Sequence, residues 1–338
     1  MTRRHATTSA GRSGGALTAR ERRRVVLLSS YVIVTAAWLY FIGIVWEAGV
    51  ILSWLFLLLI IIVSGDDRSG PSLSLRRLCL DWGGLILLVM LYRYAAALAD
   101  GLGRPVALEG LATVDRAIGF GRTPTERLQE LFPQDRPVPV WQIPLSMVYF
   151  SHFFAVPITA AVLWRRDRLV WLRFIKSFFT MAFVGVATYA LFPAAPPWMA
   201  SEQGVIDPTV RSSYFGIGRL GIRLTKAIVE TGQDWSNPVA AMPSLHAGFA
   251  LFLTLFFWRR VRPAARIALA AYAVSMAFVL VLTAEHWVSD VVAGWCVATA
   301  SILVWQRQSL RNKTPSPNDQ SDEHAALALQ EPASAISG

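Results

Sequence analysis

The chain has few charged residues and few lysines for its length. Asp, Glu, Lys and Arg make up 16% of its 338 residues, and the lysines are Lys176, Lys226 and Lys313. Soluble domains carry about 25% charged residues, so a polytopic membrane protein is the leading class and a large buried helical domain the lesser one. The formal net charge is +10, but the arginines cluster at the ends of apolar segments. This placement indicates membrane topology rather than nucleic-acid binding.

Cysteine is also scarce. Cys79 lies in a polar connection and Cys296 lies in an apolar run. A disulfide between them is not expected, and two cysteines cannot form a thiolate zinc site. The sequence therefore excludes a disulfide framework and a cysteine-based metal centre.

Apolar residues, by contrast, make up 54% of the chain and gather in long runs. A helix of about 17 residues or more can cross a hydrocarbon core of about 30 Å. The pattern predicts an all-α, polytopic membrane helix bundle of about eight spans over residues 25–306, between disordered cytoplasmic tails at 1–24 and 307–338. The predicted spans cover 25–46, 49–63 (a short one), 82–99, 143–164, 170–192, 243–259, 266–283 and 286–306.

The positions of the arginines predict which way these spans run. Arginine-rich segments occur in the N-terminal tail, in the connections 64–81, 165–169 and 259–266, and just after the last span. With eight spans, all of these segments fall on one side of the membrane, which the positive-inside rule makes cytoplasmic. The long connections 100–142 and 193–242 then face outward.

Three stretches of these outer connections are predicted to form short helices along the membrane surface. They are residues 108–118, 123–132 and 220–229. The last of them would carry Arg223 and Lys226 on its polar face.

Two histidines and an aspartate stand in the apolar, Trp-rich C-terminal part of the chain. His246 follows Pro243 and Ser244 at the start of one predicted span, and His286 begins the last span. His286 and Asp290 are four residues apart, so they share one face of a helix. The topology, which was derived from the arginines alone, places all three at the same depth on the outer side. Burying such groups in apolar surroundings is costly unless they are paired or used, so we interpret the trio as a catalytic site.

The chemistry of these side chains suits phosphoryl transfer. A neutral imidazole can attack phosphorus and leave again, which splits one transfer into two steps. Asp290 can fix the tautomer of His286 and stabilise its charged form, while His246 can protonate the departing alkoxide. The N-termini of the two helices, with Ser244 in the first turn of one, are expected to add positive potential for the phosphate.

Other interpretations of the trio remain open. Each histidine alone could be an interfacial or hydrogen-bonded residue, and two histidines with one carboxylate could hold a metal ion as a facial triad. A transporter or channel would use charged or broken helices at the bilayer midplane, whereas the trio lies near one boundary. Phosphate chemistry on this trio needs no metal, so no cofactor is predicted.

The runs Pro243-Ser244-Leu245-His246 and His286-(x)3-Asp290 resemble two motifs of the type 2 phosphatidic acid phosphatase superfamily. The resemblance covers about residues 80–306 and implies a six-helix membrane core that starts with the span 82–99. It also implies that His286 is the nucleophile, Asp290 its partner and His246 the acid for the leaving group.

Two further runs resemble one branch of that superfamily, inositol phosphorylceramide synthase of fungi and related lipid phosphotransferases. They are Phe-Pro-Ala-Ala-Pro-Pro-Trp at 192–198 and Ala-Met-Pro-Ser-Leu-His-Ala-Gly at 241–248. The resemblance makes Pro196, Trp198 and Ser244 candidate substrate-binding residues.

The chain departs from the superfamily's phosphatases in its cations. Those enzymes carry a Lys-(x)6-Arg-Pro motif and an arginine six residues before the nucleophilic histidine, whereas this chain lacks the motif and has Leu280 in place of the arginine. Arg93 and His152, inside the third and fourth spans, are candidates for a polar site, with a structural hydrogen bond as the alternative for His152. Arg211 and Arg219 are candidates for binding anionic head groups, with a solvated surface as the alternative.

We therefore predict an enzyme of the bacterial plasma membrane, with both termini cytoplasmic and the site outside. Scarce lysine beside abundant arginine is typical of a GC-rich bacterial genome. The enzyme would move a phosphorylated head group, with inositol phosphate from phosphatidylinositol as the candidate, through a phosphohistidine. The partners would be a phospholipid donor and a lipid or glycolipid acceptor, while the oligomeric state is not predicted. The alternative is a lipid phosphatase acting on phosphatidate or a polyprenyl diphosphate.

Overall fold

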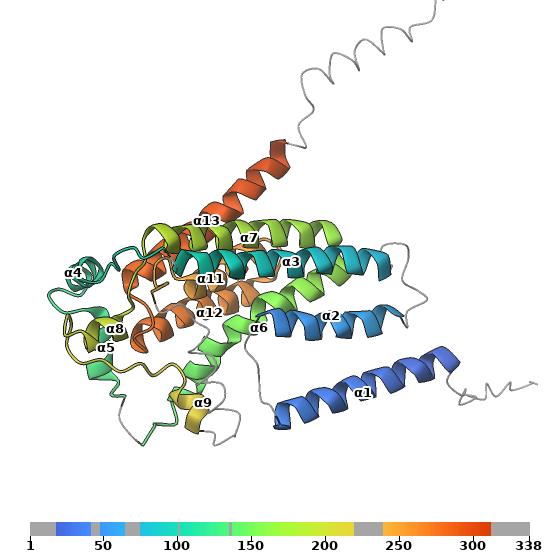
Figure 1. Cartoon of the computed structure of the whole chain (residues 1–338), viewed down its shortest axis with the longest axis horizontal. Helices are drawn as coiled ribbons and strands as arrows, with labels where there is room; N and C mark the ends of the chain where they lie inside the picture. Colours follow the sequence, from blue (N-terminus) through green and yellow to red (C-terminus); the bar gives the residue numbers. More distant parts are fainter. Residues whose placement is uncertain are drawn as a thin grey trace, which may run out of the picture.

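The computed structural model describes residues 18–41, 48–64, 75–100, 102–134, 137–219 and 239–311. Within these ranges the protein is all-α, with isolated β-bridges but no strand, and its helices form a bundle (Figure 1). The predicted fold class is confirmed. The helices are α1 (Ala19–Phe41), α2 (Ala48–Ser64), α3 (Leu75–Asp100), α4 (Glu109–Ile118), α5 (Pro124–Leu131), α6 (Gln142–Arg166), α7 (Arg168–Leu191), α8 (Pro197–Glu202), α9 (Phe215–Arg219), α11 (Leu245–Phe257), α12 (Pro263–Leu282) and α13 (Val288–Arg311).

Some helices begin earlier or end later than the sequence predicted. α1 starts at Ala19, so residues 19–24 are helical rather than part of a disordered tail. The reason is a capping box, in which the Glu21 carboxylate accepts the Thr18 N–H (2.8 Å) and the Thr18 hydroxyl accepts the Glu21 N–H (3.2 Å). α13 likewise runs to Arg311, past the predicted boundary at 306.

Other predictions concern residues that the structure does not describe. The rest of both predicted tails, and the predicted helix 220–229 with Arg223 and Lys226, lie outside the described residues. The division into a membrane domain at 25–306 and two cytoplasmic tails therefore stays a prediction.

The helices have the lengths of membrane spans. In the described parts, α1, α3, α6, α7, α12 and α13 are long and apolar enough to cross a membrane. α2 and α11 are apolar but have 17 and 13 residues, and a helix of 13 residues rises only about 20 Å. The chain is a multi-pass membrane protein, while the count of eight spans stays a prediction.

α11 lies inside the bundle and contacts α6, α7, α12 and α13. Its Phe252 and Phe256 are buried and pack on Phe174 of α7, with ring centroids 5.2 Å and 5.1 Å apart. In a membrane, close packing of this kind holds helices together, because the lipid is as apolar as the side chains. α11 is thus held in place by four neighbouring helices.

Glycines allow α11 and α13 to approach closely. A Cβ atom on Gly294 would lie 2.1 Å from the carbonyl oxygen of Ser244, and a Cβ on Gly248 would lie 3.0 Å from the carbonyl oxygen of Gly294. Small residues at such crossings let two backbones meet in a membrane. The pair therefore fixes the distance between the first turns of the two helices.

The substitution Gly294→Ala should push α13 away from α11. We expect a loss of about 1–3 kcal/mol in the free energy of unfolding, because the added methyl group meets backbone rather than a flexible side chain. Thermal unfolding of the detergent-purified protein measures this loss. Gly83→Ala on α3 is the matched control, since nothing lies within 4 Å of a Cβ there. Equal unfolding temperatures for the two variants would contradict this account of the crossing.

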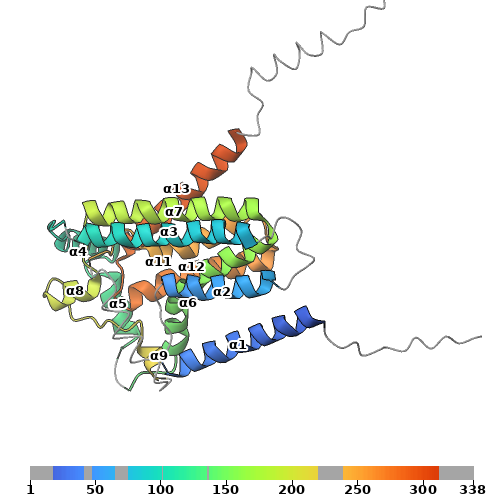
Figure 2. The same ribbon diagram turned by 45° about the vertical axis from the view of Figure 1, so that its right-hand side comes forward.

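The connections gather at one end of the bundle, which we call the loop end. α4, α5 and α8 lie there, beside the first turns of α11 and α13 (Figures 1 and 2). α4 contacts α13 and α8, and α5 contacts α12. The arginine-bearing turn between α6 and α7 lies at the opposite end (Figure 1). The short helices therefore cover the end of the bundle at which the histidine motifs begin.

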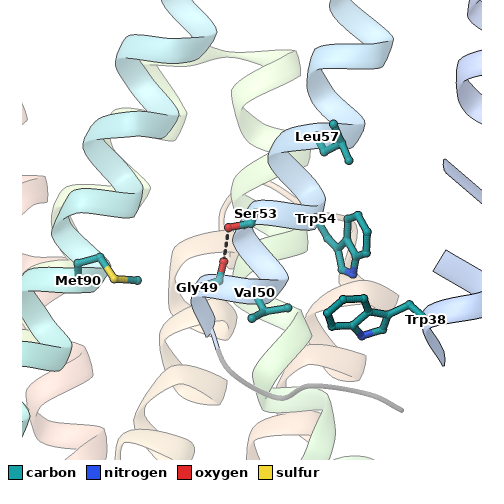
Figure 3. A pocket seen from close by; sticks show the side chains of 7 residues that line it. All are labelled: Trp38, Gly49, Val50, Ser53, Trp54, Leu57 and Met90. Atoms are coloured by element: carbon teal, nitrogen blue, oxygen red, sulfur yellow. Dashed lines mark hydrogen bonds between the residues drawn. The ribbon is translucent and has the colours of Figure 1, made fainter. Parts of the chain in front are cut away.

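A pocket of about 500 Å³ opens between α1, α2 and α3 (Figure 3). Trp38 and Trp54 meet edge to face in it, with ring centroids 5.7 Å apart. The Ser53 hydroxyl in the same pocket donates to the Gly49 carbonyl at 2.7 Å. The pocket is otherwise lined by apolar and aromatic side chains and contains none of the trio, so we place the candidate chemistry at the loop end.

Candidate active site

α11 and α13 begin side by side at the loop end. Ser244 is the N-cap of α11, because its hydroxyl accepts the Ala247 N–H at 3.3 Å. The Ser244 N–H donates to the carbonyl of Asp290 at 2.9 Å. This bond ties the starts of the two helices together, and the ring centroids of His246 and His286 lie 5.8 Å apart.

His286 and Asp290 face each other, but His286 lies two residues before Val288, the first residue of α13, and not in the helix as predicted. The His286 Nδ1 lies 3.5 Å from the Asp290 Oδ2, and the Trp287 N–H donates to that oxygen at 2.9 Å. The distance of 3.5 Å is longer than a formed hydrogen bond, as is common before a substrate binds. A proton on Nδ1, beside the carboxylate, leaves Nε2 with the lone pair. Asp290, which is fully buried, can therefore orient this ring and stabilise its charged form.

His246 is held among other rings. Tyr149 stacks on it at 5.2 Å with an interplanar angle of 15°, and His152 lies 4.0 Å away, both measured between ring centroids. His152 in turn stacks on Phe249 at 5.1 Å. The His246 Nε2 is buried and has no hydrogen-bond partner among the described residues. An oriented imidazole with an unsatisfied nitrogen is suited to exchange a proton with a substrate oxygen.

His152 lies against His246 rather than in a separate polar cavity. Its Nδ1 is buried and also lacks a hydrogen-bond partner within the described part of the chain. The structural hydrogen bond that the sequence offered as an alternative is therefore not formed at this nitrogen. The ring of His152 belongs to the packing that orients His246, and a role in substrate binding stays a prediction.

The proline run 192–198 supports the segment that leads into His286. The carbonyl of Ala195 accepts the indole N–H of Trp287 at 2.7 Å, and the Trp198 N–H donates to the carbonyl of Ala284 at 3.2 Å. Pro196 is the N-cap residue of α8. The run thus holds the residues on both sides of His286 in place.

Arg211 reaches the same segment from the connection between α8 and α9. Its Nε and Nη2 donate to the two carboxylate oxygens of Glu285 at 2.8 Å and 3.1 Å. The Ser213 hydroxyl donates to Glu285 Oε1 at 2.6 Å, and the guanidinium carbon lies 4.9 Å from the centre of the Trp198 ring. Two predicted candidates, Arg211 and Trp198, are therefore in contact with each other and adjoin the residue before His286.

Asp115 on α4 occupies the N-terminus of α13. Its Oδ2 accepts the Val288 N–H at 2.8 Å and its Oδ1 accepts the Ser289 N–H at 3.1 Å. Burial raises the pKa of this carboxyl, and the two N–H donors oppose that rise. These N–H groups bind a carboxylate and are therefore not free to bind a phosphate, while the expected positive potential of this helix end stays a prediction.

A profile of the PAP2 superfamily matches residues 109–304, from α4 into α13. The chain belongs to the PAP2 superfamily. The resemblance of its histidine motifs to type 2 phosphatidic acid phosphatases is thereby confirmed. The matched region of this PAP2 protein contains the trio, Arg211 and Asp115, whereas α1, α2 and α3 precede it.

Three curated relatives are named as synthases of inositol phosphorylceramide or phosphoinositol dihydroceramide. The inositol phosphorylceramide synthase catalytic subunit aur1 of Schizosaccharomyces pombe is 28% identical over 173 residues, which are 50% of this chain and 40% of the relative. The phosphoinositol dihydroceramide synthase of Bacteroides thetaiotaomicron is 26% identical over 169 residues, 47% of this chain and 52% of the relative. The inositol phosphorylceramide synthase of Candida albicans is 28% identical over 170 residues, 48% of this chain and 34% of the relative.

The chain thus matches only a third to a half of the length of these relatives. Their names support the branch that the sequence motifs indicated. No solved structure matches the chain.

The remaining candidates of this PAP2 protein take no part in the contacts described above. Arg219 ends α9 and donates to the carbonyl of Val138. Arg93 lies on α3 and is partly exposed. Their roles in substrate binding stay predictions.

Among the described residues, no group of three or more His, Cys, Asp or Glu side chains is arranged to hold a metal ion, which the facial-triad alternative would require.

Proposed function

We propose that this chain is a membrane phosphotransferase that moves a phosphorylated head group from a phospholipid to a hydroxyl of a lipid or lipid-linked glycan. The observation that carries the proposal is the paired geometry of His286 and Asp290, with His246 across from them at 5.8 Å between ring centroids. Inositol phosphate from phosphatidylinositol is the candidate group, because three relatives are named as synthases of inositol phosphorylceramide or phosphoinositol dihydroceramide.

In the first half of the reaction, His286 acts as the nucleophile. Its Nε2 forms a bond to the phosphorus of the donor, and the bond from phosphorus to the diacylglycerol oxygen breaks. His246 gives a proton to that oxygen, so that diacylglycerol leaves as an alcohol. Asp290 stabilises the charge that develops on the ring of His286. The product of this half is a phosphohistidine that carries the head group.

In the second half, the acceptor hydroxyl attacks the same phosphorus. His246, now neutral, takes the proton of that hydroxyl, and the bond from phosphorus to Nε2 of His286 breaks. Both histidines return to their starting state, so no net proton is gained or lost. A water molecule in place of the acceptor would make the same site a phosphatase, which is why exclusion of water decides between the two activities.

The proposed location is the bacterial plasma membrane, with the site on the extracytoplasmic side and both termini in the cytoplasm. Arginines of the turn between α6 and α7 and of the turn between α11 and α12 support it, since both turns lie at the end of the bundle opposite the trio. Positive residues of short connections favour the cytoplasmic side.

A product analysis tests the proposal. The purified chain is incubated with phosphatidylinositol labelled in its phosphate and, in turn, with ceramide, diacylglycerol or a polyprenyl-linked glycan. We expect a labelled product that carries inositol phosphate on one acceptor, together with an equal amount of diacylglycerol, by mass spectrometry. Release of inorganic phosphate from phosphatidate or a polyprenyl diphosphate, without such a product, would replace the proposal by the phosphatase.

A further inference from the structure

The segment that carries Arg211 is bound closely to the chain just before His286. The Gln129 side chain, on α5, accepts the Val210 N–H and donates to the carbonyls of Val210 and Leu282, each at 2.8 Å. The Ser212 N–H donates to the carbonyl of Thr283 at 3.4 Å. These bonds fix the backbone on both sides of Arg211, so the guanidinium is positioned by the fold rather than by its own flexibility.

The residues around Arg211 orient its guanidinium group, and the hydrogen bonds to Glu285 occupy only some of its N–H groups. A guanidinium has five N–H bonds, and the fork to Glu285 uses two of them. Burial lowers the pKa of Arg211, but the Glu285 carboxylate and, to a lesser extent, Tyr149 and Tyr214 together raise it above its usual value, so the side chain stays charged. The Glu285 carboxylate accepts three hydrogen bonds, two from Arg211 and one from Ser213. Its negative charge beside His286 is therefore compensated before an anionic substrate arrives.

Arg211 is also connected to the histidine on the other helix through a ring. It lies close to Tyr149, whose ring stacks on His246. Its other neighbour, Glu285, directly precedes His286. Arg211 is thus linked to both histidines between which the phosphorus would have to lie.

Other arginines of the loop end are engaged elsewhere. In the described part of the chain, Arg116 donates to the carbonyl of Val205, and Arg122 pairs with Glu130 and Asp207. Arg127 donates to carbonyls of the turn at 119–120. None of these contacts involves the trio. They hold the short helices together, whereas Arg211 binds Glu285, the residue directly before His286.

We propose that Arg211 binds the non-bridging oxygens of the donor phosphate, with Glu285 and Trp198 as its positioning residues. This inference rests on the proposed function. It supplies the cation that the missing Lys-(x)6-Arg-Pro motif and Leu280 leave unaccounted for. Glu285 holds one edge of the guanidinium and Trp198 supports its face, so the opposite edge can donate to the phosphate.

Binding of inorganic phosphate to the purified full chain tests this assignment without any lipid turnover. The informative variant is the double substitution Arg211→Gln/Glu285→Gln, which removes both charges and so leaves no unpaired charge in the buried site. We expect its phosphate affinity to fall by at least about tenfold in equilibrium dialysis, the size of one hydrogen bond to a charged group. Arg122→Gln is the matched control, because it removes an ion-paired arginine from the same end of the protein.

The outcomes separate this inference from the proposed function. Wild-type affinity in the double variant would overturn the assignment of Arg211 and would show a structural ion pair only. If the double variant does not fold, Arg211→Lys decides, since lysine keeps the charge but cannot bind Glu285 and phosphate through two edges; unchanged phosphate affinity would overturn the assignment. A wild-type protein that binds phosphate through Arg211 but transfers no head group would contradict the proposed function alone.

Discussion

Replacing His286 with alanine should abolish transfer of the head group. We expect a loss of at least about 10⁴-fold in turnover, because the variant has no nucleophile to form the covalent intermediate. The same variant should no longer become labelled when the protein is mixed with phosphate-labelled donor and quenched in base, where phosphohistidine survives. Loss of labelling and loss of turnover together would identify His286 as the residue that carries the phosphoryl group.

Thr299→Ala is the control for this experiment. Thr299 lies on the same helix, is exposed, and donates its hydroxyl to the carbonyl of Trp295 on that helix. This variant should keep wild-type labelling and turnover. If the His286→Ala variant retained labelling or turnover, the covalent mechanism would be wrong, while membership of the PAP2 superfamily would still stand.

Replacing His246 with asparagine should slow transfer in a way that depends on the leaving group. With a natural donor the leaving group is an alkoxide, which needs a proton, so we expect a loss of about 10²–10⁴-fold. With an aryl phosphodiester of inositol the leaving phenolate needs no proton, and the first half of the reaction should lose much less. Rapid-quench measurement of the first turnover with both donors gives the comparison.

An equal loss with both donors would contradict the role of His246 as the acid. It would indicate instead that the ring matters through its stacking with Tyr149 and His152. Thr299→Ala again serves as the control, because it should change neither rate.

Local spacing was enough to predict one contact within the trio. The helix that carries His246 was predicted to begin at 243 with Ser244 in its first turn, whereas Ser244 is the N-cap of α11. The interval of four residues between His286 and Asp290 predicted that they would face each other, and the atoms lie 3.5 Å apart. Both helices begin two residues later than predicted, at Leu245 and Val288, which is the usual uncertainty of a helix boundary.

Contacts between distant residues could not be predicted in this way. Arg211 and Glu285 are 74 residues apart, and nothing in their local patterns pairs them. Asp115 was seen only as part of a surface helix, although it is fully buried against the start of α13. The early start of α1 is a different case, since the Thr18 and Glu21 capping box is a sequence signal that the hydrophobic pattern outweighed.

The bond between Asp115 and Val288 has a consequence for how the protein is made. Asp115 is synthesised 173 residues before its partner, and a ribosome adds about 5–20 residues each second. During the many seconds between the synthesis of the two residues, α4 lies at the membrane surface with a carboxylate that the finished protein buries. α13 directly follows His286 and satisfies that carboxylate, so the trio cannot begin its chemistry before this helix has been inserted.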